Sequence, residues 1–209
     1  MNMVRWWRGR RWRRIARRIE SRIQVLAKRC MLDVGTNGAS GVPAYRHLRN
    51  DIAWEYVCLF HHLAKEVVLE RLNPERADDV LGRIRDVLIP AWIEFELRMP
   101  GRWPALQHRR DITELASLRC RSLETSDELY EYVKCRSASH GTPSALNVVL
   151  DVVGEKAAEL GEEFDVDENA RRLQACSHEF VDFVTSTICG DSDDLQAEAV
   201  PRGRRALVG

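Results

Sequence analysis

Apolar residues recur every third or fourth position along most of the chain, and this spacing predicts helices rather than strands. The first such segment runs from about Trp12 to Met31 and carries arginines on its other side. Its apolar positions are Trp12, Ile15, Ile19, Ile23, Leu26 and Cys30. The pattern predicts an amphipathic helix with a strongly basic face. Gly9 weakens the helical tendency of the residues before it.

The rest of the chain up to about Gly190 also has the helical spacing. The longest apolar face belongs to a helix from about Ala44 to Leu72, where Asn73 and Pro74 stop it. Later helices are expected over about 74–95 with Pro90 inside, around 112–118, over 125–133 behind a capping box, over 142–160, and from Asp167 to Gly190. The valine-rich run 147–153 could form a strand, but a cap before it and the helical register after it favour a helix.

These elements predict an all-α fold, an irregular bundle of about six helices preceded by a basic amphipathic N-terminal helix. A chain of 209 residues is the right length for one domain with an appendage. We expect four segments along the chain. They are a cationic amphipathic helix at 1–34, a glycine-rich linker at 35–43, a helical bundle domain at 44–190 and a flexible polar tail at 191–209.

Charge changes this picture because the net charge of zero hides a strong asymmetry. Residues 1–29 contain eleven Arg or Lys residues and one acid, Glu20, which gives +10. The remaining residues hold 21 bases and 31 acids, which gives −10. Such asymmetry is typical of a segment that meets an anionic surface. That surface is either an external partner or the protein's own acidic body, and the sequence leaves both open.

The residues expected to contact an anionic partner lie together in the basic segment. The ionic contacts are assigned to Arg5, Arg8, Arg10, Arg11, Arg13, Arg14, Arg17 and Arg18. Shallow membrane insertion, or stacking on unpaired bases, is assigned to Trp6, Trp7 and Trp12. The apolar stripe needs an apolar partner, which favours a membrane face over nucleic acid. If the stripe instead packs on the body, the arginines only offset body acids.

The expected function is that of a non-enzymatic binding or adaptor protein. Its N-terminal helix would dock on an anionic surface, preferably a membrane face, while the acidic bundle engages a protein partner. The alternative is an RNA- or DNA-binding protein that uses the same arginines. A third class is a helical enzyme with a pocket built from residues such as His61, His62 and Glu94. No motif supports this class, so we expect no catalytic residue and no cofactor.

Metal binding has only weak candidates, Cys58, His61 and His62, which share one helix with Glu66. Cys176 and His178 could complete a set of four ligands, but the spacing matches no zinc signature. A buried cysteine and a hydrogen-bonded histidine are commoner, so no metal site is predicted. Two carboxylates, Glu94 and Glu96, lie two positions apart on one helix and are expected to be solvated.

Cysteine usage and targeting patterns predict an intracellular protein. The six cysteines form no CxxC pair, and the first segment has too many charges for the apolar core of a secretory signal. No run approaches the 18 apolar residues of a membrane span. If the membrane interpretation holds, the protein is peripheral. The arginine-rich N-terminus also matches a mitochondrial presequence, although serine and threonine are scarce there.

Overall fold

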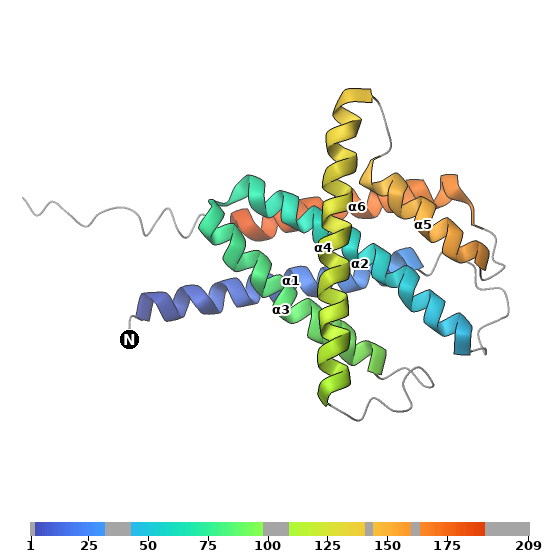
Figure 1. Ribbon diagram of the computed structural model, residues 1–209. Helices are drawn as coiled ribbons and strands as arrows, with labels where there is room; N and C mark the ends of the chain where they lie inside the picture. The colour runs from blue at the N-terminus through green and yellow to red at the C-terminus, as the bar shows by residue number, and fades with distance from the viewer. Residues whose placement is uncertain (1–2, 32–42, 98–108, 141–143, 160–163, 191–209) are drawn as a thin grey trace, which may run out of the picture.

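The structure, a computed structural model, describes residues 3–31, 43–97, 109–140, 144–159 and 164–190 (Figure 1). This part of the chain forms six helices and contains no strand, so the predicted all-α fold is confirmed. The helices are α1 (Met3–Met31), α2 (Pro43–Arg71), α3 (Pro74–Leu97), α4 (Arg109–His140), α5 (Ala145–Glu159) and α6 (Val166–Gly190). The predicted linker, apart from Pro43, and the predicted tail lie outside the described residues.

Helix α2 is at the centre of the bundle and packs against each of the other five helices. Its apolar residues therefore cover several sides, and Ile52, Val57, Phe60 and Val68 are all fully buried. Helix α1 contacts α2, α3 and α6, whereas α4 contacts α2, α3 and α5. No contact joins α1 to α4 within the described helices, because α2 and α3 lie between them (Figure 1).

Helix α1 is an integral part of this bundle. Ile15, Ile19 and Ile23 have no exposed surface, and Trp12 is only 7% exposed. The prediction that this stripe meets an apolar partner outside the bundle is therefore wrong. Burying each isoleucine contributes roughly 1.5–3 kcal/mol, which is enough to hold the helix on α2, α3 and α6. The helix also begins at Met3, because Gly9 costs only about 1 kcal/mol in a helix interior.

Helix α4 corrects the prediction of two short helices at 112–118 and 125–133. It is continuous over 32 residues, and Thr125, the expected cap of the second helix, lies exposed in its middle. The reason is that the buried positions Leu115, Leu123 and Tyr130 keep one register along the whole helix. An uninterrupted α-helix provides its own hydrogen bonds at Thr125, so no cap is needed there.

Helix α6 matches its predicted apolar face and end but starts from a different cap. The buried residues include Leu173, Cys176, Phe180, Val184 and Ile188, and the helix ends at Gly190. Asp165, not Asp167, caps the N-terminus, because its Oδ1 accepts a hydrogen bond of 2.9 Å from the backbone N–H of Glu168. The predicted cap of α5 at 142–143 lies outside the described residues.

A buried polar group joins α2, α3 and α4. Glu96 is fully buried and accepts hydrogen bonds from the Trp92 indole at 2.9 Å and from Arg119. The Arg119 guanidinium also lies 4.8 Å from the centre of the Trp54 ring. The prediction that Glu96 is solvated is therefore wrong, whereas Glu94 is exposed as expected. A buried carboxylate is tolerated here because it is paired with a guanidinium.

Candidate functional site

The exposed side of α1 carries a row of arginines. We call the five residues of this row the arginine face: Arg10, Arg13, Arg14, Arg17 and Arg18, all exposed. At 100° per residue these positions fall within an arc of about 140°, opposite the buried isoleucines. The row is about 12 Å long at 1.5 Å per residue. The first turns of α1 project beyond the other helices (Figure 1).

The charges of the arginine face are largely uncompensated. Among the described residues, Arg13, Arg14, Arg17 and Arg18 form no ion pair with a carboxylate. One turn beyond Arg18, the situation differs, because Arg22 and Arg29 both bind Glu179 of α6. The interpretation that the arginines only offset the body's own acids therefore holds for Arg22 and Arg29 but not for these four.

A groove of about 420 Å³ runs between α1 and α6 beside this row. Four arginines line it together with Ser21, Val25 and Phe183, and those arginines are Arg14, Arg17, Arg18 and Arg22. The Phe183 ring has the guanidinium groups of Arg18 and Arg22 at 5.8 Å and 5.5 Å from its centre. The ring holds the two arginines in place by cation–π contacts. The N–H groups of Arg18 stay available to an anion, whereas Arg22 already binds Glu179.

Glu20, the one acid of the basic segment, does not cancel the arginine face. Burial raises the pKa of Glu20 above its ordinary value, and this outweighs a hydrogen bond from Gln24 and the charges of Arg17 and Lys28. Glu20 lies at the edge of the arginine face, one turn beyond Arg17, but among the described residues its half-buried carboxylate forms no ion pair with an arginine of the row. The local field is therefore positive.

The predicted tryptophans do not form an inserting group on this surface. Trp12 is buried, and the Arg11 guanidinium lies 5.6 Å from its ring centre. Its assignment to membrane insertion or base stacking is therefore wrong. The side chains of Trp6, Trp7, Arg5 and Arg8 lie outside the described part of the structure. Phe183 and Val25 line the groove instead, and the sequence spacing of α1 could not indicate a residue that α6 supplies.

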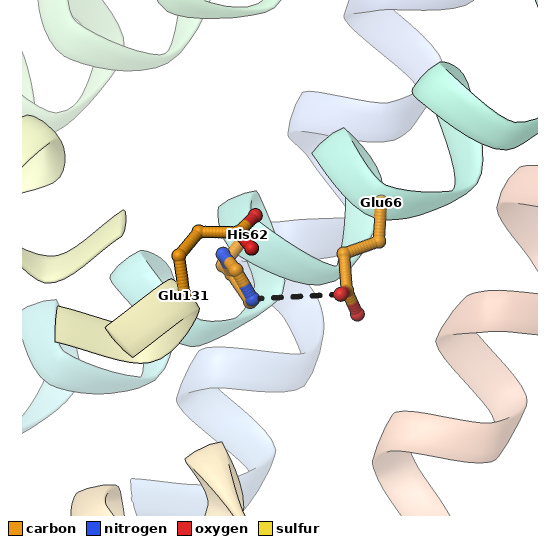
Figure 2. A group of neighbouring side chains, drawn as sticks. All are labelled: His62, Glu66 and Glu131. Carbon is orange, nitrogen blue, oxygen red and sulfur yellow. Dashed lines mark ion pairs between the residues drawn. The ribbon is translucent and has the colours of Figure 1, made fainter. Parts of the chain in front are cut away.

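A second polar site lies between α2 and α4 and consists of histidines, carboxylates and lysines. The His62 Nδ1 is 3.2 Å from Asp127 Oδ1, and His62 Nε2 is 3.9 Å from Glu66 Oε1. Lys134 binds Glu66, and the Lys65 Nζ is 3.7 Å from Asp127. Glu131 completes a trio with His62 and Glu66 in which one ligand atom from each lies within 4.8 Å of the others (Figure 2). We call this set the histidine–carboxylate cluster.

Asp127 is held in its ionised form by its neighbours. Burial alone would raise the pKa of Asp127, but the hydrogen bond from His62, the neighbouring His61 ring and the charge of Lys65 outweigh burial and lower it. Two neighbours of the cluster differ from Asp127, because in them burial prevails and the pKa rises. Burial raises the pKa of Tyr130 and raises that of Cys58 to about 12. Cys58 is therefore a protonated, buried thiol.

A cavity of about 540 Å³ opens beside the cluster between α2, α3 and α4. His61 lines it and is 2% exposed, with its Nδ1 3.7 Å from Asp127 Oδ2. Neither ring nitrogen of His61 has a hydrogen-bond partner among the described residues. Glu94 does not line this cavity, so the predicted combination of His61, His62 and Glu94 is not assembled there.

The structure brings together only part of the predicted metal candidates. His62 joins Glu66 and Glu131, whereas Cys58, Cys176 and His178 belong to no group of possible ligands in the described part of the chain. Asp127 and Glu131 were missed because no sequence signal indicates which face of α4 meets α2. Their i, i+4 spacing, which places both on one side of a helix, is the signal that was available.

The predicted protein partner of the acidic body stays a prediction. Exposed apolar side chains do occur on α4, including Leu118, Leu129 and Tyr132. No helix in the described part of the chain is both long and apolar enough to cross a membrane. Comparison of the chain with protein-family models, with curated proteins and with solved structures gives no match.

Proposed function

We propose that this protein binds the phosphate backbone of nucleic acid through the arginine face of α1. The observation that carries the proposal is a row of exposed arginines on a helix whose opposite side is fixed in the core. Four of these arginines have no carboxylate partner among the described residues. Arginine pairs with phosphate in a bidentate manner, so the row offers several strong contacts at once.

The length of the arginine row fits a short stretch of nucleic-acid backbone as the ligand. About 12 Å of helix corresponds to three or four nucleotide steps at 3.4 Å per step of one DNA strand. The groove next to the row adds the side chains of Val25 and Phe183, which a base or sugar could contact. Because these contacts address phosphates rather than base edges, we expect little sequence preference.

An anionic membrane, the partner that the sequence pattern favoured, has less support once α1 is packed. Insertion needs apolar side chains at the surface, but Trp12, Ile15 and Ile19 are buried in the bundle. Exposing each of them would cost roughly 1.5–3 kcal/mol. Binding to a phosphate backbone needs no such rearrangement. The burial of the stripe also removes the objection that nucleic acid leaves the stripe without a partner.

Fluorescence anisotropy with a labelled DNA duplex and a labelled single-stranded RNA tests the proposal. The arginine-face variant replaces four residues with glutamine: Arg13, Arg14, Arg17 and Arg18. A control variant makes the same charge change at exposed arginines on four other helices: Arg71, Arg76, Arg121 and Arg171. We expect wild-type dissociation constants of roughly 10⁻⁴–10⁻⁶ M, the range of non-specific binding.

The arginine-face variant should bind at least about tenfold more weakly, because it loses four phosphate contacts, whereas the control variant should bind like wild type. Equal loss in both variants would mean that only net charge matters. Vesicles of anionic lipid form the third arm of the experiment. Sedimentation with these vesicles, together with no binding to either oligonucleotide, would reject nucleic acid in favour of a membrane.

A further inference from the structure

We infer that His62, Glu66 and Glu131 bind a first-row divalent transition-metal ion such as Zn²⁺ or Mn²⁺. The three side chains come from α2 and α4 and lie side by side in Figure 2, with one possible ligand atom from each within 4.8 Å of the others. The site is separate from the arginine face, which α1 carries on the other side of α2. The inference therefore does not depend on the proposed nucleic-acid binding.

The orientation of the His62 ring is the first argument for a metal ligand. A carboxylate only accepts hydrogen bonds, so His62 Nδ1, at 3.2 Å from Asp127 Oδ1, carries the hydrogen. The lone pair is then on Nε2, which faces Glu66 Oε1 at 3.9 Å. Two acceptors at that distance form no hydrogen bond, and a cation between them would satisfy both. Metal-binding histidines usually donate their other N–H to a carboxylate in this way.

The surroundings of His62 also fix the ring before any ion binds. Its side chain is 2% exposed, and the ring lies 5.1 Å from that of Tyr130, centre to centre. Asp127 is itself held in place by Lys65 and the two histidines. A ligand whose rotamer is already fixed loses little entropy when the ion binds. Glu66 and Glu131 are partly exposed and can move the short distance needed to close on an ion.

The lysines next to the carboxylates are competitors of the ion. Lys134 binds Glu66, and the Lys65 Nζ is 3.9 Å from Glu131. The side chain of Lys134 is 63% exposed, so solvent readily replaces its contact with Glu66. A divalent ion would bring twice the charge of one lysine to the same oxygens. Removing Lys134 should consequently strengthen metal binding, whereas it would weaken a purely structural ion-pair cluster.

His61 is the second, independent observation. It is almost fully buried, lines the cavity of about 540 Å³ together with Asp127 and Glu131, and has no hydrogen-bond partner among the described residues. Three protein ligands leave coordination positions open for water. Water that the ion holds in this cavity would give the His61 ring a partner. The cavity also provides a path by which the ion reaches Glu131.

The set of donor atoms indicates the class of ion. One imidazole nitrogen with two carboxylates suits Zn²⁺, Mn²⁺ or Fe²⁺ better than the all-oxygen ions Mg²⁺ and Ca²⁺. No thiolate takes part, because no cysteine in the described part of the chain belongs to this group of ligand atoms. Copper(I), which prefers sulfur ligands, is therefore not expected.

Isothermal titration calorimetry of the full-length protein with ZnCl₂ tests the site. Cys135 and Cys189, the two exposed cysteines in the described part of the chain, are first changed to serine so that they cannot bind zinc. We expect one ion per chain. Glu66→Gln and Glu131→Gln should each weaken binding at least about tenfold, and Asp127→Asn by about 10–100-fold. Lys134→Met should tighten it.

Glu70→Gln is the matched control, because Glu70 is exposed on the same helix one turn beyond Glu66 and, among the described residues, joins only Arg71 in an ion pair. It should bind zinc like the parent protein. Circular dichroism checks that each variant is folded, and the two glutamines keep the size of the side chains they replace. Absence of zinc binding by the parent at about 100 µM zinc would overturn the inference, as would unchanged binding in both Glu66→Gln and Glu131→Gln.

Discussion

The arginine face and the histidine–carboxylate cluster are both charged, but their charges are satisfied in opposite ways. The arginine face carries a single sign, is exposed, and has almost no carboxylates beside it. The cluster mixes carboxylates, lysines and histidines within a few ångströms and is partly buried. Like charges left together on a rigid helix weaken the folded state slightly, and the proposed phosphate ligand would offset that cost.

The cluster shows the opposite relation between charge and fold. Here the charged groups help to join α2 to α4, so their loss should lower the free energy of unfolding. The difference teaches that net charge alone does not distinguish a binding surface from a structural network. The number of partners that each charged group has within the fold makes that distinction. Each of the following variants tests one side of the comparison.

The largest effect on the free energy of unfolding is expected from the buried side of α1, the helix that carries the arginines. Ile19→Ala should lower the free energy of unfolding by about 2–5 kcal/mol, because it leaves a cavity among α1, α2, α3 and α6. Val25 on the same helix is 52% exposed, so Val25→Ala should change the free energy of unfolding by no more than about 0.5 kcal/mol. Urea denaturation measures both. Equal, small effects of the two substitutions would show that α1 does not pack stably on the other helices.

A smaller effect is expected in the cluster. Asp127→Ala removes the carboxylate that His61 and His62 share, so we expect a loss of about 1–3 kcal/mol in the free energy of unfolding. The arginine-face variant should change this free energy by less than about 0.5 kcal/mol per site, because its side chains have few partners to lose. A stability loss that is larger for the arginine-face variant would reverse the comparison.

The smallest effect concerns pH. The folded-state pKa of Asp127 is lowered, so its contribution to stability is complete above the unfolded-state pKa of about 3.9 and is lost as the pH falls from there through the folded-state pKa. Urea midpoints measured between about pH 3 and 6 should fall less steeply for Asp127→Asn than for wild type. The arginine-face variant removes no carboxylate and should keep the wild-type slope. Identical slopes of urea midpoint against pH in all three proteins would contradict the assigned role of Asp127.

The sequence predicted the helices well because each apolar residue reports on one surface of its own helix. The stripe of Ile15, Ile19 and Ile23 was recognised as apolar, and only its partner was wrong. The sequence could not distinguish an external apolar surface from α2, α3 and α6, since both would bury the same side chains. The asymmetric charge favoured an external partner over the protein's own core.

The candidate sites were harder to predict because each one combines helices that are distant in sequence. His62 meets Asp127 across 65 positions, and Arg22 meets Glu179 across 157. Helical periodicity places a residue on a face but does not indicate which other helix lies opposite. Glu96 shows the same limitation, because its burial depends on Arg119, which is supplied by α4.

The salt dependence of nucleic-acid binding tests the central claim most directly. If the four unpaired arginines contact about four phosphates, a plot of log K against log salt concentration for a DNA duplex should have a slope of about −3.6. The arginine-face variant should lose most of this slope, while the control variant with the same charge change keeps it. A wild-type slope near zero, or equal slopes in the two variants, would contradict the account.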